Sequence, residues 1–198
     1  MTTPNTDIVE QGSLLLAVAR AAIAREFGVA FSCDKNLFDK YTEWLRAPGA
    51  AFVTLMRHGE LRGCIGSLEA QRPLLTDVEA NARAAAFSDP RFAPLAAAEL
   101  NQIDIEVSIL SPLQALEFTD EVAALAQLRP GIDGVVFECG NHRSTFLPQV
   151  WQQLPNAREF MAHLKAKAGL PTNFWADTVQ LFRYSVRKWK ECEFDSGD

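Results

Sequence analysis

The stretch from Ala51 to Ser67 decides the fold, and it reads AFVTLMR HG ELRGCIGS. Residues 51–57 are rich in β-branched and large apolar side chains, which favour a strand. His58-Gly59 then fits a two-residue turn, because glycine adopts the positive φ angle of such a turn at little cost. Residues 60–68 return as a second strand. The stretch therefore predicts an antiparallel hairpin.

Further strands and helices are predicted around this hairpin. Residues 102–110 alternate, with isoleucine or valine at the odd positions and Asp104, Glu106 and Ser108 between them, as in a strand with one face on the core. A second hairpin is expected at residues 135–139 and 142–147, and a long strand at 178–189. Helices are expected at 12–27, 41–47, 73–87, 119–128 and 156–169, the last with Asn156 and Glu159 as a capping box.

This order of elements does not repeat as βαβ units, which favours an α+β fold. We expect a mainly antiparallel sheet flanked by helices. One domain is expected over residues 1–198, with its core at about 12–188. The turn-rich residues 111–134 are expected to form a smaller second lobe.

Charge and composition argue against several classes of partner. The 198 residues carry a net charge of -6 with a sequence pI near 5.1, so the surface repels phosphate backbones and anionic lipids. No apolar run approaches the ~20 residues that cross a bilayer, and the first seven residues lack the basic region of a signal peptide. The four cysteines are scattered without a Cys-x-x-Cys pair. We therefore expect a cytoplasmic protein with reduced thiols that binds neither nucleic acid nor membrane.

The returning strand contains the hexapeptide Leu61-Arg62-Gly63-Cys64-Ile65-Gly66. Strict alternation places Arg62 and Cys64 on one face of the strand and Leu61 and Ile65 on the other. An arginine beside a cysteine favours the thiolate, which is the reactive form. Two glycines in one short strand usually mark a bulge or the close approach of a ligand or another backbone. These residues predict a thiol site with room for a ligand.

The same hexapeptide also allows a purely structural interpretation. A single cysteine is most often a small buried hydrophobic residue. Gly63 and Gly66 would then serve only the packing or twist of the strand.

The hexapeptide resembles the signature of the AMMECR domain family, also called AmmeMemoRadiSam system protein A. Four further segments resemble the family in the same order, namely residues 89–95 (DPRFAPL), 105–111 (IEVSILS), 145–151 (TFLPQVW) and 167–170 (KAGL). The resemblance covers residues 12–188, although residues 141–144 depart from the Gly-rich stretch of many members. It implies an α+β fold with a larger and a smaller subdomain, and no established activity. For prokaryotic members it implies a Memo-like protein and a radical SAM protein as partners.

Three residues are the candidate catalytic groups. Cys64 would be a nucleophile or acid, Arg62 would hold an anionic group, and Glu106 would orient Arg62 or act as a general base. Glu106 could equally lie on a solvated outer face of its strand.

Four more residues are candidate substrate-binding positions: Gly63, Gly66, Arg91 and Thr145. Arg91 could bind a carboxylate or phosphate, or instead pair with Asp89. Thr145 precedes a strand-to-helix junction that could hold an anion, or an ordinary helical turn.

We expect no metal and no cofactor. Cys139 and His142 have a Cys-x-x-His spacing, but a structural zinc site needs four ligands. The chain has no Gly-rich nucleotide motif and no three-cysteine iron–sulfur spacing. Two functions stay open: an enzyme that binds a small-molecule ligand at the hexapeptide, and a non-catalytic partner that presents a substrate to Memo-like or radical SAM proteins.

Overall fold

The computed structural model describes residues 4–194 of the chain. The chain divides into two compact units: residues 1–110 with 187–198 form the first, and residues 111–186 form the second. Both units combine helices with antiparallel strand pairs, so the predicted α+β class is confirmed. The second unit begins where the smaller lobe was expected, but it extends to residue 186 rather than 134.

The first unit is built on a four-stranded sheet with the order β10-β5-β2-β3. These strands are β2 (Ala51–Arg57), β3 (Glu60–Gly66), β5 (Ile103–Leu110) and β10 (Val186–Lys190). The predicted hairpin is present as β2 and β3, and its turn residues His58 and Gly59 have φ angles of 53° and 81°. A separate short pair joins β1 (Pro48–Gly49) to β4 (Arg72–Pro73).

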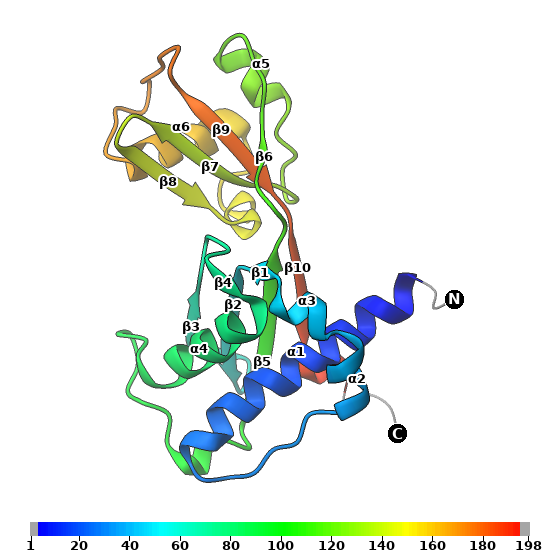
Figure 1. The fold of residues 1–198 in the computed structure, drawn as a ribbon. Helices are drawn as coiled ribbons and strands as arrows, with labels where there is room; N and C mark the ends of the chain where they lie inside the picture. The colour runs from blue at the N-terminus through cyan, green and yellow to red at the C-terminus, as the bar shows by residue number, and fades with distance from the viewer. Residues whose placement is uncertain (1–3, 195–198) are drawn as a thin grey trace. The chain divides into compact units, whose positions relative to one another are not determined.

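Two long helices, α1 (Pro4–Glu26) and α4 (Leu74–Phe87), pack against this sheet (Figure 1). The shorter helical elements of the unit are α2 (Lys35–Lys40), α3 (Thr42–Arg46), η1 (Ala97–Glu99) and η3 (Glu191–Glu193). α1 begins eight residues before the predicted start at residue 12. Its first residue, Pro4, is compatible with the first turn of a helix. Within residues 4–194, no helix is both long enough and apolar enough to cross a membrane.

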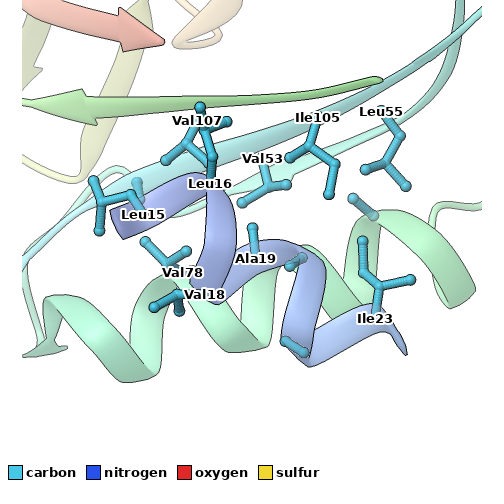
Figure 2. Packing of buried hydrophobic residues seen from close by; sticks show 14 of the residues in the cluster. Leu15, Leu16, Val18, Ala19, Ile23, Val53, Leu55, Val78, Ile105 and Val107 are labelled. Atoms are coloured by element: carbon cyan, nitrogen blue, oxygen red, sulfur yellow. The ribbon is translucent and has the colours of Figure 1, made fainter. Parts of the chain in front are cut away.

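The core of the first unit lies between these helices and one face of the sheet. Figure 2 shows Leu16 and Ala19 of α1 facing Val53, Ile105 and Val107 of the strands. All five side chains are buried. Each large apolar side chain buried in this way contributes roughly 1.5–3 kcal/mol. The odd-numbered residues of β2 and β5 therefore define the core face of the sheet, and the even-numbered residues define its outer face.

A β-bulge at Arg62 interrupts the register of β3. Leu61 is opposite Met56, but Gly63 is opposite Leu55, so Arg62 is the extra residue. A bulge of one residue moves every following side chain to the other face of the sheet. Unbroken pairing would have placed the charged Arg62 opposite Leu55, on the core face.

The bulge decides where Cys64 lies. Cys64 is opposite Thr54 on the outer face, whereas unbroken pairing from the turn would have placed it opposite Val53 in the core. Leu61 lies on the same outer face, and Ile65 lies on the core face. The prediction that Leu61 and Ile65 share a face is therefore wrong, because strict alternation does not hold across a bulge.

The second unit has its own four-stranded sheet with the order β6-β9-β7-β8. Its elements are β6 (Gln114–Ala115), α5 (Glu121–Ala126), β7 (Gly134–Cys139), β8 (His142–Phe146), η2 (Pro148–Gln152), α6 (Ala157–Lys167) and β9 (Gln180–Tyr184). Trp151 stacks on Phe160 with ring centroids 3.8 Å apart, and Phe137 and Leu164 are fully buried in the same core. Asn156 caps α6 by accepting bonds from the Arg158 and Glu159 N–H groups.

Two expectations about the strands need correction. The predicted second hairpin belongs to the second sheet, so residues 4–194 form two main antiparallel sheets rather than one. The long strand expected at 178–189 is divided into β9 and β10, which belong to different sheets. No glycine or proline separates β9 from β10 at Tyr184-Ser185-Val186, so no turn residue in the sequence marks the break.

Candidate functional site

Cys64 and Glu106 lie in one row across the outer face of the first sheet. Thr54 of β2 is directly opposite both residues, Cys64 on β3 and Glu106 on β5. The Thr54 hydroxyl donates a hydrogen bond to Cys64 Sγ at 3.2 Å. Because neighbouring strands are about 4.8 Å apart, roughly 10 Å separates the backbones of Cys64 and Glu106. The structure therefore brings these two predicted residues onto one face, with Thr54 between them.

Glu106 is bound by two lysines of β10. Lys188 Nζ donates to Glu106 Oε2 at 3.0 Å, and Lys190 Nζ lies 3.6 Å from Oε1. Trp189, between the two lysines, is buried instead. The Glu106 side chain is only 14% exposed. Its contacts are thus those of a carboxylate that holds two ammonium groups at the outer face.

Arg62 is engaged by Glu99 of η1. Its Nε and Nη2 donate to the two carboxylate oxygens of Glu99, each at 3.0 Å, and Arg57 Nη1 donates to Glu99 Oε1 at 2.7 Å. The Arg62 hydrogen bonds, followed by the Ala96 N–H, lower the pKa of Glu99 to about 2. Arg62 Nη1 is buried and has no hydrogen-bond partner within residues 4–194. Glu106 therefore does not orient Arg62, and the thiol of Cys64 receives its hydrogen bond from Thr54 instead.

Asp89 and Arg91 cover the open edge of β3 at Cys64. β3 is the last strand of its sheet, so backbone groups that face away from β2 need other partners. The Cys64 N–H donates to Asp89 Oδ2 at 2.8 Å, and the Cys64 carbonyl accepts from Arg91 Nη2 at 3.3 Å. Arg91 Nη2 also donates to Asp89 Oδ2 at 2.7 Å, so the Asp89–Arg91 pair is present. This pairing holds the pKa of the buried Asp89 well below its ordinary range.

Arg91 is also a cation whose charge reaches the Cys64 thiol. The hydrogen bond to Asp89 is the main cause of the raised pKa of Arg91. The Arg91 side chain is 53% exposed. Its Nη1 donates to no acceptor in the described part of the chain. An exposed guanidinium with an unused donor beside a thiol is suited to binding a carboxylate or phosphate group.

Gly63 and Gly66 make room for atoms of the chain itself. A Cβ on Gly63 would lie 2.1 Å from the carbonyl oxygen of Ala85 in α4. A Cβ on Gly66 would lie 2.2 Å from the ring of Phe52. Both distances are far shorter than any real Cβ contact, so both glycines have a packing reason within the first unit.

The sequence model of the AMMECR1 family matches residues 16–189. The chain belongs to the AMMECR1 family. A protein of Methanocaldococcus jannaschii is 34% identical, over 93% of this chain and 92% of its own length. A protein of Methanothermobacter thermautotrophicus is 36% identical, over 92% and 95%. The crystal structure of an uncharacterized protein from Pyrococcus horikoshii has a TM-score of 0.74 and 29% identity, and the match covers 91% of both chains.

Thr145 of this AMMECR1-family chain lies in the second unit, on β8. Its hydroxyl is 3.1 Å from the Tyr184 hydroxyl, and its carbonyl accepts from Lys167 Nζ at 3.0 Å. Burial raises the pKa of Tyr184. The polar groups of Thr145 are therefore bonded within the second unit.

A polar pocket of about 400 Å³ opens where β3 of the AMMECR1 chain ends, and Ser67, Arg72 and Asp77 contribute to its lining. Asp77 is buried on α4. Its carboxylate accepts from the Ala51 N–H at 2.8 Å, the Ser67 hydroxyl at 2.7 Å and Arg72 Nε at 2.7 Å. These bonds tie α4 to β2 and to the segment that follows the hexapeptide.

Several residues that contact Cys64, Arg62 or Glu106 were not identified from the sequence. Counting back from the His58-Gly59 turn pairs Thr54 with Gly63, and only the bulge at Arg62 brings Thr54 opposite Cys64. The alternation around the buried Trp189 indicates that Lys188 and Lys190 share the opposite face. No local pattern points to Glu99, because its contact with Arg62 spans 37 residues of sequence.

Proposed function

We propose that the outer face of the first sheet binds a small anionic molecule, with the Cys64 thiol as the group that reacts with it. The supporting observation is the environment of Cys64. Its sulfur accepts the Thr54 hydroxyl hydrogen bond, and its carbonyl accepts from the half-exposed Arg91. The hydroxyl orients the sulfur, and the guanidinium offers a partner for an anionic ligand close to the nucleophilic group.

Each residue of the proposed site has a separate role. Arg91 binds the anionic group of the ligand through its unused Nη1, Cys64 supplies the nucleophilic sulfur, and Thr54 orients that sulfur. Glu106 is a positioning residue, because it holds its two lysines along the same face. Arg62 does not bind the ligand in this proposal, because Glu99 engages its guanidinium.

The rate of Cys64 alkylation by iodoacetamide at pH 7 tests the proposal on the native, full-length chain. Mass spectrometry of the cysteine peptides resolves each thiol, Cys64→Ser assigns the signal, and the exposed Cys192 is the internal reference. We expect Cys64 to react faster than Cys192. Arg91→Ala should slow the Cys64 reaction about threefold, which corresponds to ~0.6 kcal/mol for one partly exposed charge.

Arg62→Ala is the matched control, because it removes an arginine from the same strand as Cys64. This variant should leave the Cys64 rate within about twofold, since Glu99 rather than the thiol engages Arg62. Circular dichroism establishes that each variant is folded. A native Cys64 that stays unlabelled while Cys192 reacts would overturn the proposed thiol chemistry. A slower rate in Arg62→Ala but not in Arg91→Ala would overturn the assignment of the cation.

The outer face also offers a surface for the alternative role, in which the domain docks a Memo-like or radical SAM protein without catalysis. Leu61 lies on this face and is 40% exposed. Protein-binding surfaces expose contiguous apolar patches, so this role needs Leu61 to act together with the partly buried Phe52 and Met56 of the same face. An inert Cys64, together with partner binding that Leu61→Glu abolishes, would favour this role over the thiol site.

We further propose a cytoplasmic location. Cys33, Cys64 and Cys139 form no disulfide in the described part of the chain. Free thiols of this kind persist in reducing compartments. Fractionation of the native cells with antibody detection tests this location, and recovery from a secreted or membrane fraction would contradict it.

A further inference from the structure

The second unit contains a pocket of about 330 Å³ between α5, α6 and the loop after α6. Both helices are labelled in Figure 1. α5 contributes residues 121, 122 and 125, and α6 contributes residues 158, 162 and 165, so each helix presents one side to the pocket. All of these residues belong to the second unit, whereas Cys64 belongs to the first.

Lys165 is the buried charge of this pocket, with a side chain only 2% exposed. Its Nζ donates to Glu121 Oε1 at 2.8 Å and to the Phe174 carbonyl at 2.9 Å, and it lies 5.9 Å from the centroid of the Trp175 ring. An ammonium group has three N–H donors. Among residues 4–194, the Glu121 carboxylate and the Phe174 carbonyl are the two acceptors of the Lys165 ammonium. Burying a charge is costly unless its donors are satisfied. A ligand atom that accepts the third hydrogen bond would complete the coordination of Lys165.

Arg158 places a second cation at the same pocket. It is exposed, it lies on the first turn of α6, and its guanidinium forms no ion pair within the described residues. Lys165 already balances the charge of Glu121. The pocket therefore keeps one positive charge, which matches a ligand with one negative charge.

One wall of the pocket is apolar. Val122 is 69% exposed, the largest value for any large hydrophobic side chain within the described residues, and Leu125 and Ala162 lie on the same pocket. The volume is near the lower end of the range for ligand pockets, about the liquid volume of roughly ten water molecules. A short-chain acid fits this size, and a nucleotide does not.

We propose that this pocket binds a small monocarboxylate with a short apolar tail. The carboxylate accepts hydrogen bonds from Arg158 and from the third N–H of Lys165. The tail packs on Val122 and Leu125 and removes their surface from water. The site is separate from the proposed thiol site, so the failure of either one leaves the other standing.

A titration of the ¹⁵N-labelled full-length chain with isovalerate, followed by NMR, tests this proposal. Saturable shifts are expected at the amides of Val122, Ala162 and Asn173. Isovaleramide has the same shape without the charge and should give no saturable shift. Acetate lacks the tail and should bind at least about threefold more weakly.

Arg158→Ala isolates the anion contact, because an exposed side chain can be removed without disturbing the fold. It should raise the dissociation constant for isovalerate about tenfold. Arg143→Ala removes the same charge from β8, away from the pocket, and should leave the constant unchanged. The proposal is overturned by an absence of saturable shifts, by equal shifts with isovaleramide, or by an unchanged constant in Arg158→Ala. Equal affinity for acetate would overturn the role of the apolar wall.

Discussion

Gly63→Ala tests whether close packing against α4 explains the first glycine of the hexapeptide. The added Cβ would lie 2.1 Å from the backbone oxygen of Ala85, whereas ordinary van der Waals contact begins at 3.4 Å. The edge of the sheet or α4 must therefore retreat by roughly 1 Å. Backbone atoms on a helix cannot rotate away as the end of a flexible side chain can.

The size of the effect follows from this geometry. Overpacking by one methyl group costs about 1–3 kcal/mol, and a collision with backbone belongs at the upper end of that range. A domain has only about 5–15 kcal/mol of stability, so the loss is large. For a unit of this size, ~3 kcal/mol lowers the melting temperature by roughly 10 °C. Gly66→Ala should cost less, because its Cβ meets the side chain of Phe52, which can move.

Urea denaturation followed by circular dichroism measures both variants against the parent chain. The expected order of stability is parent, then Gly66→Ala, then Gly63→Ala. A Gly63→Ala variant within about 0.5 kcal/mol of the parent would refute the packing argument. The glycine would then be better explained by the approach of a ligand, as the sequence suggested.

Three further outcomes are expected. The pKa of Glu99 is about 2 instead of 4.5, so its contribution to stability is complete above pH 4.5 and is lost as the pH falls toward 2. Glu99→Gln should flatten the acid-unfolding curve over that interval, and an equally steep curve would contradict this. Lys165→Ala should lower the urea-unfolding free energy by about 3 kcal/mol, because it removes a buried cation and leaves Glu121 unpaired; a loss under about 1 kcal/mol would be inconsistent with that burial. Burial raises the pKa of the Cys33 thiol, so its alkylation should lag behind that of the exposed Cys192 at pH 8 and still increase above pH 9; equal rates at pH 8 would contradict this.

The parts of the fold that depend on neighbouring residues were predictable from the sequence. The two-residue turn at His58-Gly59 fixes where β2 ends and β3 begins, and the alternation from Ile103 onward identifies the core face of β5. Asn156 is a recognisable cap because its hydrogen bonds reach only two and three residues ahead. Each signal is local, so tertiary packing did not override it.

The parts that depend on distant contacts were not predictable. A charged residue cannot remain opposite Leu55 in the core, and the bulge at Arg62 removes that conflict. Its position is fixed by Glu99, which is remote in the sequence, so strict alternation gave the wrong faces within the hexapeptide. Gly63 is likewise explained only by a helix carbonyl 22 residues away in the chain, which no local pattern reveals.

The division of the last long strand between two sheets sets an order of assembly on the ribosome. β2, β3 and β5 are synthesised within the first 110 residues, but β10, which pairs along β5, arrives only at residues 186–190. All the strands of the second sheet are complete by residue 184. The second unit can therefore finish folding while the first sheet still has β5 as an open edge, and open edges recruit strands from other chains. A nascent or truncated chain that stops before residue 186 is thus exposed to edge-to-edge aggregation, and pairing of β10 with β5 removes the hazard.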